Sequence, residues 1–258
     1  MIPFALGRHT GLALSGPARL LLPVLMVLVL SACRDQSDEH LIQGTALGTG
    51  YHITLYADLD QTQVAALEAG IQGEMATLER QRSVFTHALA TAFRRFWIAT
   101  PGLQHEVDRQ THVLAVDRLV QWLEEHRPAP AAVLVELGGV LRAQGESPDG
   151  GWRLSLELAG LPGPDGARHL RLRNAALVHR FARQERVPLL TLTTPLAVSV
   201  IAPSASEAMH QASRLMQADP EHALALAESM DSAARVVVKT PQGIEIQHTA
   251  ALEPWLEP

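Results

Sequence analysis

The sequence has little cysteine, few aromatic residues and no excess of positive charge, and each shortage excludes a class of protein. A single cysteine, Cys33, among 258 residues rules out an internal disulfide. Aromatic residues make up 4% of the chain and the formal net charge is −6, which argues against a nucleic-acid-binding surface. The chain also lacks a P-loop, a G-x-G-x-x-G fingerprint, an H-E-x-x-H motif and a nucleophile elbow. No standard local motif therefore indicates its chemistry.

The first part of the chain resembles the leader of a bacterial lipoprotein. Arg8 and Arg19 accompany an apolar run at residues 20–30, which is too short to span a bilayer comfortably. The run ends in Leu-Ser-Ala-Cys, which is similar to a lipobox. The resemblance implies that residues 1–32 are a signal peptide and that Cys33 is acylated. An uncleaved membrane anchor with an incidental cysteine is the alternative.

The lipoprotein resemblance also implies a place in the cell envelope. Residues 33–43 are expected to be a polar tether, and residues 44–258 a single domain. Arg34 follows the cysteine where an Asp would keep such a protein at the inner membrane, which favours the outer membrane. The expected location is therefore a lipid-anchored one that faces the periplasm.

Beyond residue 44 the chain shows patterns typical of strands and helices. Residues 50–57 alternate apolar and polar side chains, as in a half-buried strand. One helix is expected with an apolar face formed by Val64, Leu67, Ile71, Met75 and Leu78, and another near residues 111–126. Strands are then expected at 132–137, 140–144, 152–158, 169–173, 176–182, 189–194 and 196–202, with a closing hairpin at 234–248. Clustered strands with few helices predict an α+β fold with an antiparallel or mixed sheet core and flanking helices.

Three shorter features concern helix starts and a candidate metal site. Ser204 and Glu207 have the S-x-x-E spacing of a capping box, which predicts a helix start. Asp219 followed by Pro220 predicts the start of another helix. The polar segment 105–112 is a candidate metal site, although its spacing matches no standard ligand pattern and a solvated helix entry is the alternative.

A set of segments in a fixed order resembles the FAD:protein FMN transferases, the ApbE-type flavin transferases. The segments are 44–55, 83–96, 115–124, 134–145, 151–158 and 199–215. The resemblance implies an ApbE-like fold that is shortened after Phe96. It also implies a Mg²⁺-dependent reaction that transfers FMN from FAD to a threonine of a target protein. A divalent cation held by carboxylates would neutralise the charge that develops on the phosphoryl group.

The same resemblance implies a set of flavin-binding positions. They are Leu47, Gly48, Thr49, Phe85, Glu106, His112, Gly138 and Gly139. Leu47 stands where the family has a methionine that touches the flavin, and Phe85 stands for an aromatic residue that borders it. Glu106 keeps a carboxylate, whereas His112 and Val113 replace a Lys-Gly pair.

The expected metal site is where the chain departs most from the family. The metal-ligand positions implied by the resemblance fall on Met209, Ala212 and Ser213, of which only the Ser213 hydroxyl could remain a ligand. One hydroxyl cannot hold a hard cation that prefers several oxygens. Glu207 is a candidate substitute ligand, with its place in the capping box as the alternative. No catalytic residue is therefore assigned.

Three hypotheses about function remain open. The first is a divergent flavin transferase that uses FAD, Mg²⁺ and a protein acceptor. The second is a non-catalytic, lipid-anchored relative that binds flavin or a partner protein. The third is an unrelated α+β lipoprotein. The loss of metal ligands beside retained scaffold segments favours the second.

Overall fold

The computed structural model describes residues 37–92, 101–126, 128–156, 168–182 and 194–257, without the side chains of 101–104. Residues from Ser37 onward form one compact unit. The expected signal peptide, Cys33 and the strand expected at 189–194 lie outside the described residues.

The described strands and helices come in groups along the chain, with α2 and α4 between β2 and β3 and with α5 and α6 between β8 and β9. The helices are α2 (Gln61–Ala92), α4 (Pro101–Glu125), α5 (Ala205–Leu215), α6 (Ala223–Ser229) and the 3-10 helix η2 (Ala250–Trp255). The strands are β1 (Asp38–Ala46), β2 (Thr49–Ala57), β3 (Ala132–Leu137), β4 (Val140–Gly145), β5 (Trp152–Ser155), β6 (His169–Leu172), β7 (Ala176–Phe181), β8 (Ala197–Ala202), β9 (Ala233–Thr240) and β10 (Gly243–His248).

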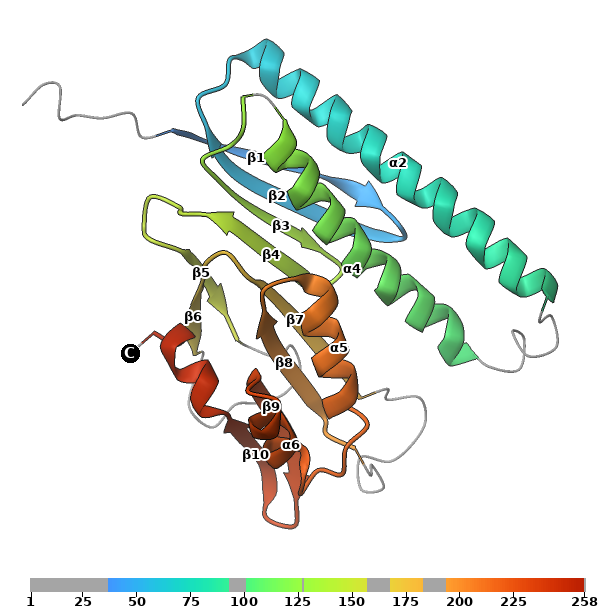
Figure 1. Ribbon diagram of the computed structural model, residues 1–258, viewed down its shortest axis with the longest axis vertical. Helices are drawn as coiled ribbons and strands as arrows, with labels where there is room; N and C mark the ends of the chain where they lie inside the picture. The colour runs from blue at the N-terminus through green and yellow to red at the C-terminus, as the bar shows by residue number, and fades with distance from the viewer. Residues whose placement is uncertain (1–36, 93–100, 127, 157–167, 183–193, 258) are drawn as a thin grey trace, which may run out of the picture. The chain divides into compact units, whose positions relative to one another are not determined.

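Eight of these strands form one sheet in the order β1-β2-β3-β4-β7-β8-β9-β10, and β5 pairs with β6 separately. Every described pairing is antiparallel. The predicted α+β class with an antiparallel core and flanking helices is therefore confirmed (Figure 1).

The large sheet separates the two larger of three hydrophobic clusters among the described residues. Helices α2, α4, α5 and α6 pack on one face, and β5, β6 and η2 pack on the other. The alternation of β4 explains this division, since Val140 belongs to the helix-side core whereas Leu141 and Ala143 belong to the opposite one. Strand β8 is buried along its whole length, because both of its faces are covered.

The structure corrects two expected boundaries near the start of the domain. Residues 38–43, expected in the polar tether, form most of β1, so the strand begins before the expected domain start at Gly44. The sequence signal was weak because β1 is an edge strand with mostly exposed side chains. Helix α2 continues through Ala92, so Phe85 is helical.

Two later helix boundaries also differ from the expectation. Helix α4 begins at Pro101, about three turns before Thr111, so the polar segment 105–112 is helical. Helix α6 begins at Ala223, because residues after Asp219 first form a turn that is closed by a hydrogen bond from the His222 backbone N–H to the Asp219 carbonyl, 2.9 Å. None of the described helices is long and apolar enough to cross a membrane.

Candidate functional site

Helix α5 starts directly after β8, and its free backbone N–H groups are already satisfied. Ser204 is the N-cap, and its hydroxyl accepts a hydrogen bond from the backbone N–H of Glu207 at 3.2 Å. The Glu207 side chain is exposed and accepts from Gln211 Nε2 at 3.4 Å. Glu207 therefore lies in the first turn of a capped helix, as the S-x-x-E spacing predicts.

Asp117 of α4 provides a second cap for the same helix. Its carboxylate accepts from the backbone N–H groups of Ala205 and Ser206, each at 3.0 Å, and from the Ser206 hydroxyl at 2.7 Å. The same carboxylate forms an ion pair of 2.7 Å with Arg142 of β4. With three N-terminal donors occupied, the start of α5 is not an open anion-binding site.

Two of the three positions that the resemblance gives as metal ligands point into the core. Met209 is 1% exposed and Ala212 is fully buried, and both belong to the helix-side core. Ser213 is half-buried, and its hydroxyl donates to the Met209 carbonyl at 2.7 Å. The period of buried residues along α5 thus places apolar side chains where the family pattern would place oxygen ligands.

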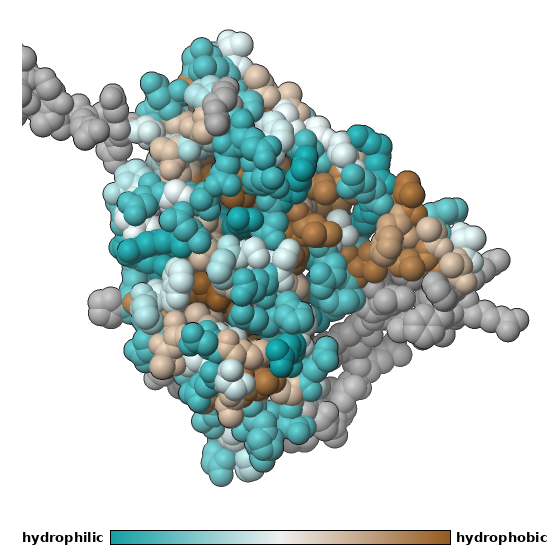
Figure 2. All heavy atoms as spheres, in the orientation of Figure 1, coloured by the Kyte–Doolittle hydropathy of each residue, from teal (hydrophilic) through white to brown (hydrophobic). Residues whose placement is uncertain are grey.

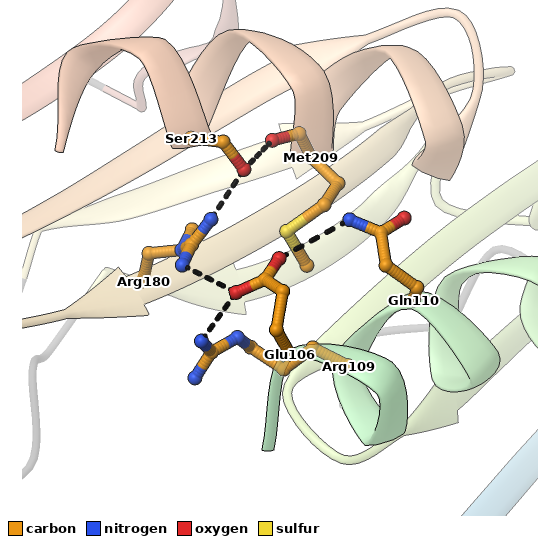
Figure 3. A network of polar contacts seen from close by, with 6 residues as sticks. All are labelled: Glu106, Arg109, Gln110, Arg180, Met209 and Ser213. Atoms are coloured by element: carbon orange, nitrogen blue, oxygen red, sulfur yellow. Dashed lines mark hydrogen bonds and ion pairs between the residues drawn. The ribbon is translucent and has the colours of Figure 1, made fainter. Parts of the chain in front are cut away.

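A positively charged side chain, that of Arg180, contacts Ser213. The guanidinium of Arg180, on β7, donates to the Ser213 hydroxyl and also to Oε2 of Glu106 on α4 at 3.1 Å (Figure 3). The Arg180 side chain is 14% exposed. It therefore joins α4 to α5 by bridging the two oxygen-bearing residues that the resemblance places in the site.

Glu106 is the centre of this network. Arg109 donates to Oε2 of Glu106 at 2.6 Å, and Gln110 donates to Oε1 at 3.3 Å. Partial burial favours the protonated carboxyl, but the hydrogen bond from Arg109 and the charge of Arg180 outweigh it, so the pKa of Glu106 lies below its ordinary value. Burial lowers the pKa of Arg180, and the charge of Glu106 opposes this effect. The pair is ionised at neutral pH.

These side chains do not fit a magnesium ion. Mg²⁺ requires near-octahedral oxygen coordination and usually binds through carboxylates. Glu106 supplies the one carboxylate of the network, and both its oxygens already accept hydrogen bonds. Within the described ranges, no group of three or more His, Cys, Asp or Glu side chains could hold a metal ion, and this includes residues 105–112 of the candidate metal segment.

A cavity of about 450 Å³ lies between α2 and α4 and is bordered by Glu106. Its lining comprises Leu78, Gln81, Arg82, Phe85, Glu106, Val107, Gln110, Thr111 and Leu114. Phe85 and Leu114 are 55% and 58% exposed, and Figure 2 shows hydrophobic surface over the adjoining parts of the two helices. The ion pair between Arg82 and Asp108, 2.5 Å, ties the helices together beside it. The volume is that of a small-molecule pocket.

Three other predicted flavin-binding residues, Leu47, His112 and Gly138, lie together where two turns of the sheet contact α4. Leu47 and Gly48 form the β1–β2 turn with φ of 55° and 82°, and the Leu47 side chain is only 2% exposed. The Leu47 backbone N–H donates to Glu79 of α2 at 2.7 Å, and its carbonyl lies 3.1 Å from Nε2 of His112. The imidazole of His112 also lies against Gly138, where a Cβ would be 2.5 Å from His112 Nδ1.

The structure therefore divides the predicted flavin-binding set. Phe85 and Glu106 line the cavity. Leu47, His112 and Gly138 join two turns of the sheet to α4. Gly48 and Gly139 are exposed turn residues with no atom within 4 Å of a Cβ built on them, and Thr49 is half-exposed at the start of β2.

Sequence reasoning missed Arg180 and a second polar group on the sheet. His179 Nδ1 lies 2.8 Å from the Ser199 hydroxyl, which is 2% exposed, and Arg235 is the next residue in this row across β7, β8 and β9. Burial, with a smaller effect of the Arg235 charge, lowers the pKa of His179 to about 4. The signal that could have identified Arg180 is its place in a largely apolar strand, since a charge buried there needs a partner of opposite charge.

The fold is that of several solved flavin transferases. The chain is similar to the flavinyl transferase ApbE of Pseudomonas stutzeri in its apo form, with a TM-score of 0.62 and 18% identity over 86% of this chain and 97% of that one. It is similar to the flavin transferase ApbE of Vibrio cholerae, with a TM-score of 0.62 and 16% identity over 85% of this chain and 100% of that one. The ApbE protein of Thermotoga maritima gives 0.60 and 13%, over 86% and 100%.

No family model and no curated protein sequence matches the chain. At identities of 13–18% the structural matches establish an ApbE-like fold and leave the chemistry to the residues of the site.

Proposed function

We propose that this protein is a non-catalytic, lipid-anchored relative of the flavin transferases that binds a flavin reversibly. The observation that carries the proposal is the Arg180 network. Arg180 donates to the hydroxyl of Ser213, the one polar side chain among the three expected metal-ligand positions, and pairs with the nearby carboxylate of Glu106. A transferase that depends on Mg²⁺ for charge neutralisation would have no ion there.

The cavity between α2 and α4 supports flavin binding. An isoalloxazine ring is flat and apolar on its faces and carries hydrogen-bonding groups on its edge. Phe85, Leu78 and Leu114 offer apolar surface, while Gln81 and Gln110 offer amide groups. Aromatic side chains favour offset stacking on such rings. Bound in this way, a flavin would supply a redox-active ring system, and the chain's own residues would only hold it.

The leader sequence supports the anchored location. The apolar run at 20–30 and the Ala-Cys junction at Cys33 resemble those of a lipoprotein precursor. We therefore place the protein in the cell envelope facing the periplasm, with the outer membrane favoured by Arg34. Flavin-binding proteins held there would meet flavin or a partner protein at the membrane surface.

Two measurements on the full-length chain in detergent test the proposal. Fluorescence titration with riboflavin, FMN and FAD should give saturable, reversible binding. Incubation with FAD, Mg²⁺ and an acceptor protein that carries the target threonine should give no covalent flavin by in-gel fluorescence, with the Pseudomonas stutzeri enzyme as the positive control. Covalent flavin on the acceptor would overturn the non-catalytic assignment, and absence of any flavin binding would overturn the assignment as a flavin-binding protein.

A pair of neighbouring variants tests the cavity itself. Phe85→Ser removes an aromatic side chain from the lining, whereas Val84→Ser changes the adjacent residue, which is 71% exposed and outside the lining. Phe85→Ser should weaken riboflavin binding about tenfold or more, which is the scale of one lost aromatic contact. Val84→Ser should bind as the parent does. Equal weakening by both variants would place the flavin elsewhere.

A further inference from the structure

The network around Glu106 carries an excess of positive charge. Two guanidinium groups, those of Arg109 and Arg180, donate to the same carboxylate oxygen at 2.6 and 3.1 Å. Among the described residues, Glu106 is the carboxylate that forms ion pairs with both of these arginines. The cluster thus has a net charge of +1, in a place where Arg180 is largely shielded from water.

One donor of the cluster has no acceptor among the described residues. The Nε of Arg109 is buried and makes no hydrogen bond to the described part of the chain. A buried donor left without a partner costs about 1–3 kcal/mol, so an anion that supplies an oxygen there would be favoured. Guanidinium groups bind phosphate oxygens well, since their N–H groups form a planar fork.

The cluster also borders the ligand-sized cavity. Glu106 belongs to both, and Val107 and Gln110 of the same helix line the cavity wall. Arg109 and Arg180 lie behind Glu106 and outside the lining, so an anionic group attached to a ring in the cavity would reach them at the Glu106 end. A divalent cation bound through Oε2 of Glu106 would have to displace the two guanidinium groups that donate to this oxygen.

We propose that Arg109 and Arg180 form a metal-free site for the phosphate group of a ligand whose apolar part lies in the α2–α4 cavity. The chain itself then supplies the positive charge that a bound metal ion would otherwise bring. This inference names the ligand chemistry of the same site and rests on the proposed function for its choice of flavin as the probe. Arg180 acts on the phosphate directly and also positions Glu106 between α4 and α5.

The experiment compares FMN with riboflavin, which differ by one phosphate, on the full-length chain in detergent. Fluorescence titrations are made in EDTA and in excess Mg²⁺. FMN should bind about tenfold more tightly than riboflavin, in keeping with one charge-assisted phosphate contact. The ratio should be the same in both buffers, because the arginines need no metal.

Variants assign the effect to the arginines. Arg180→Met and Arg109→Met should each remove most of the preference for FMN, measured within each variant as the ratio of its FMN and riboflavin affinities. Arg180→Lys keeps the charge without the fork and should retain part of the preference. Arg214→Met is the matched control, because Arg214 is an exposed arginine of α5, and it should leave both affinities unchanged. Circular dichroism checks that each variant is folded.

Each other outcome is decisive. Equal affinities for FMN and riboflavin would overturn the phosphate site and leave flavin binding standing. A preference that appears only with Mg²⁺ would overturn the metal-free assignment. If neither flavin binds, the proposed function fails, and thermal shift with inorganic phosphate decides the inference. Stabilisation that is lost in Arg180→Met supports the site, and no stabilisation overturns it.

Discussion

The imidazole of His112 lies against Gly138, so close that a Cβ on this glycine would be 2.5 Å from Nδ1. His112 also contacts the Leu47 carbonyl through Nε2, at 3.1 Å. One side chain of α4 therefore fixes the β1–β2 and β3–β4 turns together. The Gly-Gly pair at 138–139 is explained by this contact and by backbone geometry, without a ligand.

Gly138→Ala should be clearly more destabilising than Gly139→Ala. Both residues have positive φ, 58° and 80°, so each alanine is strained by about 1 kcal/mol. Only at Gly138 does the new methyl group meet a side chain, which should raise the loss to about 2–4 kcal/mol. Urea denaturation measures both. Adding His112→Ala to Gly138→Ala should recover part of the lost unfolding free energy. Equal losses at the two glycines would show that the Gly138–His112 contact does not affect stability.

Asp117→Ala should destabilise the protein by about 2–4 kcal/mol, because it leaves Arg142 unpaired and two N–H groups of α5 without their acceptor. Ser204→Ala removes a single capping bond and should cost about 1 kcal/mol. Chemical denaturation of both variants gives the comparison. A loss at Asp117 no greater than that at Ser204 would contradict the double role of Asp117.

His179 should make the protein less stable in acid. Its pKa is about 4 in the folded chain and about 6.5 when unfolded, so the unfolded state takes up the proton first as the pH falls. The stability lost between pH 7 and pH 4 from this group is roughly 3 kcal/mol. His179→Gln, which can still hydrogen-bond to Ser199, should lose correspondingly less over the same range. Identical pH profiles of unfolding free energy for the two proteins would refute the assignment.

Cys33→Ala should abolish lipid attachment. Acylation at this position requires the thiol, and Cys33 is the only cysteine. In bacterial cells grown with labelled palmitate, the parent should incorporate label and partition into detergent, and the variant should do neither. Label retained in the variant would contradict attachment at Cys33, and a parent without label would remove the anchored location from the proposed function.

The helix at 205–215 shows how far sequence reasoning reaches. Its start was predicted from Ser204 and Glu207, because capping is a local property of the chain. The resemblance also predicts that Met209 and Ala212 stand at metal-ligand positions, and the structure buries both side chains in the core. Arg180 was not, since 33 residues separate it from Ser213 and only the pairing of β7 with β8 and the packing of α5 bring them together.

Phe85 and β1 show where local patterns mislead. The buried positions of α2 are Leu67, Ile71 and Met75, so the period is weak in its second half and the expected apolar face ends at Leu78, before Phe85. Its contact with α4, through Arg82 and Asp108, is tertiary. Residues 38–43 read as a tether because strand pairing with β2, not burial, holds that edge strand in place.

Strands β2 and β3 are direct neighbours in the sheet, although α2 and α4 intervene between them in the chain. Tyr51 pairs with Leu137 and Tyr56 with Ala132, so the register of the sheet continues across this excursion. The helical pair that carries the cavity is thus an insertion between two adjacent strands. A change in the length or lining of the helical pair at the cavity therefore need not alter the pairing of β2 with β3.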